Sequence, residues 1–169
     1  MGFKEISPYE IKSNVFDLIA NKWFLVCAGD EKGANCMTAS WGSMGHIWNK
    51  PLITTVIRPQ RYTKKFVDEN EYAAFCFLPE EYRKQLGYLG RVSGRDEDKI
   101  KNSGLTPVYE NNTMYFAESD LVIIGKKVYT QDMKEECFEE KSLAEAMYPT
   151  KDYHTAYTYE IIKVLEKGE

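Results

Sequence analysis

Apolar runs rich in β-branched and aromatic residues recur along the chain, and they restrict its fold more than any other feature. Their composition and most of their lengths fit strands better than helices. Amphipathic helices do not alternate regularly with these runs, so a doubly wound α/β sheet is not expected. A mainly β, antiparallel barrel with helices attached fits the pattern better. The runs occupy residues 23–28, 51–58, 72–78, 119–129 and 153–165.

The segments between these runs carry signals for turns and short helices. Glycine and charged residues at 29–33 predict a turn, so the run at 23–28 should pair with a strand at 35–40. Asn111 and Asn112 predict a second hairpin. Further expectations are strands at 106–109 and 114–116, helices at 14–20, 61–70, 79–90 and near the end of 93–103, a loop at 43–50, a bent strand near Gly125, and a polar excursion with some helix at 131–147.

Length and composition fit a single domain covering residues 1–169, with 43% hydrophobic residues to form its core. The net charge of -4 argues against a nucleic-acid binder. No apolar run approaches the ~18 residues of a membrane span, and the start of the chain has no apolar segment typical of a signal peptide. A cytoplasmic protein without nucleic-acid or membrane partners is therefore the expectation.

Signatures of common catalytic centres are missing from the sequence, among them GxSxG, HExxH, the GxxxxGK[ST] phosphate loop and GxGxxG. Only His46 and His154 are available as histidines, and such residues are more often structural than catalytic. The cysteines form no CxxC pair and most lie in strand-like runs, which predicts small buried hydrophobes; they are Cys27, Cys36, Cys76 and Cys137. Neither a catalytic side chain nor a metal site is predicted.

The stretch at 35–42, NCMTASWG, is too polar for a buried strand and too apolar for an ordinary loop. Its small residues leave backbone N–H groups open to a flat ligand, and its larger ones offer apolar surface beside such a ligand. The small residues are Thr38, Ala39 and Ser40, and the larger ones are Met37 and Trp41. A strand end that enters a turn explains the same composition.

A polar segment at the end of the strand at 51–58 leads directly into the helix predicted at 61–70. Guanidinium groups, hydroxyls and a helix N-terminus together favour a phosphate. A solvated turn, capped by Thr63 and with the arginines in water, explains the segment equally well. Its members are Arg58, Gln60, Arg61, Tyr62 and Thr63, and a second cluster with Ser93, Gly94, Arg95 and Lys99 either adds donors or forms a charged surface turn.

One phosphate site and one flat, backbone-lined apolar site together suit flavin mononucleotide, FMN. Its ring stacks on apolar surface, and its ribityl phosphate requires cations. Hydride transfer to or from a flavin needs no protein acid or base at the reacting carbon. The absence of a catalytic triad is therefore compatible with flavin chemistry.

Several motifs occur in one order over nearly the whole chain. They are N-C-M-T-A-S-W-G at 35–42, W-N-K-P at 48–51, R-P-Q-R-Y-T at 58–63, F-C-F-L-P at 75–79, L-G-Y-L-G at 86–90, S-G-R-D-E-D-K at 93–99 and Y-H-T-A-Y at 153–157. With these motifs the chain resembles the flavin reductase-like family, and within it the flavoredoxin-type members. The resemblance implies an FMN-binding split β-barrel of Greek-key type, six-stranded and antiparallel, usually a homodimer with FMN near the subunit interface.

The resemblance also implies roles for individual residues. The isoalloxazine would be lined by Met37, Thr38, Ala39, Ser40 and Trp41, with Asn35 either orienting that strand or capping a turn. The phosphate would be held by Arg58, Arg61 and Thr63, with Gln60 and Tyr62 nearby and with Ser93, Gly94 and Lys99 at the polar end. The segment 86–90 would shape the pocket wall or simply pack on the barrel, and Tyr153 and Tyr157 would serve mainly in packing.

Three functions are compatible with this pattern. An FMN-dependent oxidoreductase would transfer hydride or electrons between NADH or NADPH, flavin and an acceptor. An electron carrier of the flavoredoxin type would hold FMN without using a nicotinamide and would exchange electrons with a redox partner protein. A dimeric barrel with a decayed ligand site is the third. Retention of the cations at 58–63 and of the small residues at 38–40 argues against the last.

Overall fold

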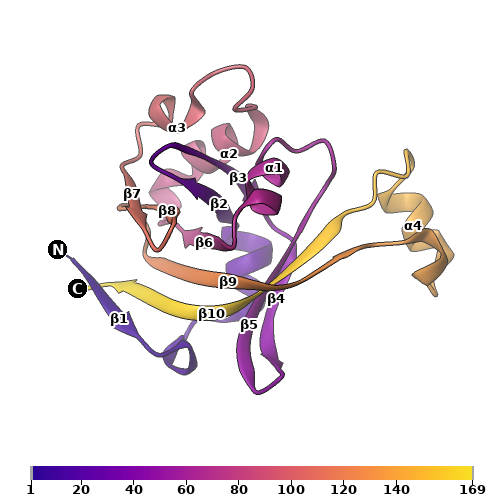
Figure 1. Ribbon diagram of the computed structural model, residues 1–169, viewed down its shortest axis with the longest axis horizontal. Helices are drawn as coiled ribbons and strands as arrows, with labels where there is room; N and C mark the ends of the chain where they lie inside the picture. Colours follow the sequence, from indigo (N-terminus) through magenta and orange to yellow (C-terminus); the bar gives the residue numbers. More distant parts are fainter. Residues whose placement is uncertain (1, 169) are drawn as a thin grey trace.

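The computed structural model describes residues 2–168 and contains one large antiparallel sheet (Figure 1). Its strands are β1 (Phe3–Ile6), β2 (Phe24–Asp30), β3 (Gly33–Ala39), β4 (Gly42–Ile47), β5 (Lys50–Ile57), β6 (Tyr72–Phe77), β9 (Leu121–Asp132) and β10 (Thr155–Lys167). The order is β3-β2-β6-β9-β10-β5-β4, and β1 also pairs with β10. A separate hairpin consists of β7 (Pro107–Glu110) and β8 (Thr113–Phe116). The expected antiparallel, mainly β architecture is confirmed.

Short helices flank this sheet. They are α1 (Thr63–Glu69), α2 (Arg83–Arg91), α3 (Lys99–Asn102) and α4 (Lys141–Met147), with single helical turns at Pro8–Glu10, Asp17–Lys22, Glu80–Tyr82 and Glu135–Cys137. In Figure 1, α1, α2 and α3 lie near β2 and β3, whereas α4 lies at the far end of the long arm made by β9 and β10. Within residues 2–168, no helix is long and apolar enough to cross a membrane.

The two predicted hairpins are present. In the first, β2 and β3 pair with Cys27 opposite Cys36. In the second, Asn111 and Asn112 have φ values of 50° and 53°, which are the left-handed conformations that a two-residue hairpin turn requires. Asparagine tolerates this region better than other non-glycine residues, so the pair acts as a turn signal.

The prediction of a loop at 43–50 is wrong, because this segment forms most of β4 and the start of β5. His46 lies opposite Pro51, and the reversal occurs at Trp48 and Asn49, with φ values of 54° and 56°. β4 lies at the edge of the sheet and is largely exposed, so it lacks the apolar composition that marks the other strands. The resemblance implies a six-stranded barrel, and the large sheet of the structure has eight strands, β1 and β4 among them.

The expected bend near Gly125 is present. The register between β9 and β10 shifts between Ile161 and Lys163, directly beside the pairing of Gly125 with Ile161. A Cβ atom at Gly125 would lie 2.6 Å from the Cβ atom of Tyr159. Glycine therefore allows the aromatic ring to cross the strand at close range, and the ring packs edge-on against Phe75 in the barrel core.

Two apolar cores are separated by the sheet. One core fills the barrel and contains Phe24, Phe75 and Tyr159; the other lies under α2 and the hairpin of β7 and β8, and contains Leu86 and Phe116. The thiols of Cys27, Cys36 and Cys76 are in this second core, as predicted for small buried hydrophobes, whereas Cys137 is exposed. Burial raises the pKa of Cys27, so its thiol is protonated near neutral pH.

Candidate functional site

A cavity of about 210 Å³ opens where β3 ends and β10 begins. It is lined by Met37, Thr38, Ala39, Ser40, Trp41, Val56, Arg58, Arg61 and His154. Residues 37–41, which were predicted to line a flavin ring, are all in its wall, and we call it the ring-side cavity. Met37 is buried in the barrel core, and the Thr38 hydroxyl donates to the carbonyl of Leu86 at 2.6 Å. Because these side chains have other partners, much of what β3 offers the cavity is backbone and small side chains.

A second hollow of about 200 Å³ adjoins the first, and Arg61 lines both. The hollow is lined by Gln60, Arg61, Tyr62, Thr63, Gly90, Arg91, Val92, Ser93, Arg95 and Lys99. The structure thus brings together the two polar clusters predicted from the sequence, the one at 58–63 and the one at 93–99. The cluster at 93–99 lies in the loop between α2 and α3 and at the start of α3, and this loop packs beside the segment at 60–63.

Four cations line this hollow: Arg91 and Arg95 are exposed, whereas Arg61 is half-buried and Lys99 is buried. Arg61 donates to the carbonyl of Gly90 at 2.9 Å, and the buried ammonium of Lys99 donates to the carbonyls of Leu89 and Val92 at 2.9 and 3.0 Å. Neither cation forms an ion pair with a carboxylate in residues 2–168. Burial lowers the pKa of each, and the charge of Arg61 further lowers the pKa of Lys99. The hollow is therefore suited to an anion.

Asn35 and Thr63 are structural supports of this hollow. The Asn35 amide donates to the Thr63 hydroxyl at 3.0 Å, and both side chains are buried. Thr63 is the first residue of α1, as expected, but it does not cap the helix. Tyr62 occupies the capping position with helical dihedrals, and no side chain caps α1. The capping interpretation of Thr63 is therefore wrong, because its side chain faces the interior.

Gly94 lies against Asn35 and Tyr62. A Cβ atom at this position would be 2.6 Å from the Asn35 side-chain oxygen and 3.2 Å from the Tyr62 ring. The Tyr62 ring also lies under the Arg95 guanidinium, 4.6 Å from its centroid. The backbone at 94 thus approaches β3 closely, which explains why a glycine stands there.

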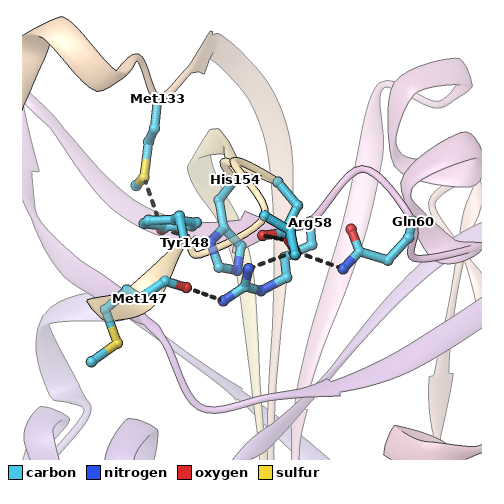
Figure 2. A network of polar contacts seen from close by, with 8 residues as sticks. Arg58, Gln60, Met133, Met147, Tyr148 and His154 are labelled. Carbon is cyan, nitrogen blue, oxygen red and sulfur yellow. Dashed lines mark hydrogen bonds and ion pairs between the residues drawn. The ribbon is translucent and has the colours of Figure 1, made fainter. Parts of the chain in front are cut away.

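Arg58 lies on the ring side and not in the anion hollow. Its guanidinium donates to the carboxylate of Asp152 at 2.6 Å and to the carbonyl of Met147 at 3.0 Å, and the Gln60 amide donates to the same carboxylate at 2.8 Å (Figure 2). The hydrogen bonds from Gln60 and Arg58 hold the pKa of the Asp152 carboxyl below its usual range. Asp152 thus neutralises much of the positive charge of Arg58, which was predicted to bind a phosphate. No sequence signal identified Asp152, which lies between the polar excursion predicted at 131–147 and the run at 153–165.

His154 and Val56 line the cavity although sequence reasoning did not assign them to the site. The Nδ1 atom of His154 lies 2.7 Å from the hydroxyl of Tyr148 (Figure 2). The centroid of its ring lies 5.2 Å from that of the Trp41 ring. Burial lowers its pKa to about 4, with a further contribution from the charge of Arg58. His154 is hydrogen-bonded, as expected, and it also lines the cavity. Val56 lines the cavity too, near the end of β5 and two positions before Arg58.

Gly90, Tyr153 and Tyr157 pack the elements around the site. Gly90 brings α2 against β3, since a Cβ atom there would lie 3.1 Å from the Thr38 side chain. Tyr157 is fully buried in the barrel core and donates to Asp68, and Tyr153 packs on the ring of Tyr148 at 4.8 Å. These contacts fit the packing roles expected for both tyrosines.

Acidification is expected to destabilise the protein through His154. The unfolded chain binds a proton there below about pH 6.5, whereas the folded state binds it only near pH 4. The unfolded state therefore holds more protons in this window, and the free energy of unfolding falls as the pH falls. Urea unfolding measured from pH 7 to 4.5 gives the free energy of unfolding at each pH. This free energy should fall more steeply with falling pH for the wild type than for His154→Gln, and the difference in slope should correspond to at most one bound proton. Parallel declines would contradict this assignment.

Comparison with known proteins identifies the class. The fold is that of an antiparallel split barrel, with the paired cavities beside the end of β3. The family described as the flavin reductase like domain matches residues 16–159, and the chain belongs to this family. No curated protein matches the chain.

Solved structures with the same fold include three from bacteria. An FMN-binding domain of a flavin reductases-like enzyme from Shewanella baltica is 14% identical, with a TM-score of 0.71, covering 98% of this chain and 77% of that one. Flavoredoxin of Desulfovibrio vulgaris is 22% identical, with a TM-score of 0.68 and coverages of 94% and 75%. A Shewanella frigidimarina protein with a split barrel domain is 20% identical, with a TM-score of 0.67 and coverages of 95% and 76%. These likenesses establish the split-barrel fold.

Proposed function

We propose that this chain binds FMN across the two adjoining cavities and acts as an oxidoreductase. The observation that carries the proposal is the pair of cations in the anion hollow, Arg61 and Lys99, which lack a carboxylate partner within residues 2–168. The Lys99 side chain is buried and the Arg61 side chain is half-buried, and such cations without a counter-ion are costly unless an anion completes the site. The ribityl phosphate of FMN is such an anion, and the adjoining cavity has the apolar wall that its ring needs.

Each group of residues has a part in holding this cofactor. Arg61, Lys99 and the backbone near Ser93 would bind the phosphate. The backbone at 38–41 would face an edge of the ring, and Met37 and Trp41 would exclude water from it. When bound, FMN supplies the capacity to accept and release hydride or single electrons. The residues of the chain then contribute binding, orientation and exclusion of water.

The first candidate activity is transfer of hydride from NADH or NADPH to the flavin and on to an acceptor. Membership of the flavin reductase-like family favours it. Purified protein mixed with FMN should acquire the spectrum of bound flavin, and anaerobic addition of NADH or NADPH should bleach that spectrum. Protein that does not bind added FMN would contradict the whole proposal.

An electron carrier of the flavoredoxin type is the second candidate. Two of the similar structures are flavoredoxins, from Desulfovibrio vulgaris and Methanosarcina acetivorans, and the sequence has no GxGxxG nucleotide fingerprint. In the same anaerobic titration, a carrier would keep its oxidised spectrum with either nucleotide. Dithionite, or a reduced redox partner protein, would bleach it.

We also infer that two copies of the chain associate. Apolar side chains are exposed at the turn after β4 and on the outer half of β9, where Trp48 packs on Tyr129 with ring centroids 6.1 Å apart. Ile47 and Val128 are exposed beside them in sequence. Exposed apolar side chains of this kind favour an interface, and a homodimer agrees with the resemblance to the family. Light scattering of the purified protein measures this directly.

A further inference from the structure

His154 places an imidazole in the wall of the ring-side cavity, and the proposed cofactor binding leaves its chemistry unused. Only 7% of the residue is exposed. Nδ1 is 2.7 Å from the Tyr148 hydroxyl, whereas Nε2 has no hydrogen-bond partner within residues 2–168. Trp41 and Arg58 line the same cavity beside the ring. The imidazole therefore has one nitrogen fixed by the protein and one available to a ligand.

The partner of Nδ1 determines which nitrogen carries the proton. The Tyr148 hydroxyl lies 2.7 Å from Nδ1 of His154 and 3.6 Å from the sulfur of Met133 (Figure 2). An imidazole nitrogen is a much stronger acceptor than a thioether, and a phenol is a stronger acid than a neutral imidazole N–H. Tyr148 therefore donates to Nδ1. The proton of the neutral ring then resides on Nε2, which becomes a donor.

The charges around the ring keep it neutral. Burial and the adjacent guanidinium of Arg58 both lower the pKa of His154, to about 4. The carboxylate that would favour the imidazolium, Asp152, already accepts hydrogen bonds from Arg58, Gln60 and Thr150. At neutral pH the group is thus an uncharged N–H donor. It would have to form an imidazolate to give up this proton, so it polarises a ligand without protonating it.

We propose that Nε2–H of His154 is a binding site for a carbonyl oxygen in the ring-side cavity, with Tyr148 as the positioning residue that fixes the tautomer. The inference rests on the proposed function. A neutral donor suits an uncharged oxygen, whereas anionic groups are better bound by Arg61 and Lys99 at the other end. The carbonyl belongs either to the flavin ring itself or to a carbonyl compound that lies against it as electron acceptor.

The tautomer can be tested by NMR on the full chain without any cofactor. His46 and His154 are the only histidines, so ¹⁵N-histidine labelling of a His46→Asn variant leaves one imidazole. We expect the neutral Nε2–H form at pH 7, and a loss of tautomer preference in Tyr148→Phe. An Nδ1–H tautomer, or an imidazolium at pH 7, would overturn the proposal.

Added ligands separate the two sources of the carbonyl. If the flavin is the source, FMN alone shifts the Nε2–H signal. If the acceptor is the source, acetophenone added to the FMN-loaded protein shifts the signal, whereas α-methylstyrene, which lacks the oxygen, does not. Protein that binds FMN but shows no shift in either arm overturns only the role of His154. Protein that does not bind FMN overturns the proposed function as well.

Two substitutions provide an independent measurement. His154→Leu removes the donor, and its affinity for the responding ligand should fall about five- to tenfold, as for one hydrogen bond. His154→Gln retains an N–H donor and should lose less. Equal losses would indicate that the side chain only fills space. Should the leucine variant fail to fold, the NMR result on the protein that keeps His154 still decides the matter.

Discussion

Arg61→Gln is expected to weaken FMN binding by roughly 10- to 100-fold while riboflavin binding changes much less. The guanidinium lines both cavities and lacks a carboxylate partner within residues 2–168. A charge-assisted contact to phosphate contributes about 1.5–3 kcal/mol, which corresponds to this range. Riboflavin lacks the phosphate, so the difference between the two ligands isolates the contact.

Flavin fluorescence titrations of both ligands measure the effect. Lys65→Gln is the matched control, because it removes the same charge from an exposed position on α1 that lines neither cavity. Thr63 should be left intact, since its hydroxyl accepts the buried bond from Asn35 and its loss would disturb the fold. Equal losses for FMN and riboflavin would show that Arg61 does not bind the phosphate.

Gly94→Ala is expected to lower both FMN affinity and stability. The new methyl group would lie 2.6 Å from the Asn35 side-chain oxygen, and Asn35 cannot withdraw without breaking its bond to Thr63. The loop must shift, and overpacking of this kind costs about 1–3 kcal/mol. Because Ser93 and Lys99 line the hollow on either side of Gly94, FMN affinity should fall by roughly tenfold.

A double variant tests the cause of this effect. Asn35→Ala removes the atom that the new methyl group meets, so the combined free-energy change of Gly94→Ala and Asn35→Ala should be smaller than the sum of the single changes. Urea unfolding of the four proteins provides the numbers. If the two free-energy changes simply add, the contact between the new methyl group and Asn35 is not the cause of the destabilisation. Gly87→Ala serves as control, since nothing lies within 4 Å of a Cβ atom at that position.

The sequence carried enough information to predict the central strands and most turns. Apolar runs such as the one at 72–78 became buried strands because burial selects their composition. Asn111 and Asn112 marked their turn through backbone preference alone. β4 was missed because an exposed edge strand needs no apolar pattern. β1 was missed because its pairing with β10 joins opposite ends of the chain, which local composition does not record.

For the candidate site, residue chemistry identified the two polar clusters, but it did not show which side chains of these clusters bond to residues elsewhere in the chain. Arg58 and Arg61 are three positions apart and look alike in the sequence. The structure directs Arg58 to Asp152, ninety-four positions away, and leaves Arg61 in the hollow. Likewise, His154 became part of the cavity wall only through the fold, which places the start of β10 beside the end of β3. Contacts over such separations are set by topology.

The segment 133–153, which carries α4 at the end of the β9–β10 arm, is hydrogen-bonded to Arg58 and His154, which both line the ring-side cavity. Arg58 bonds both Asp152 and the carbonyl of Met147, and His154 bonds Tyr148. Local unfolding of this segment would therefore break the cavity wall. The segment and the wall should open together, with a single free energy of local unfolding. By the same linkage, any molecule that fills the cavity slows amide exchange along the whole segment.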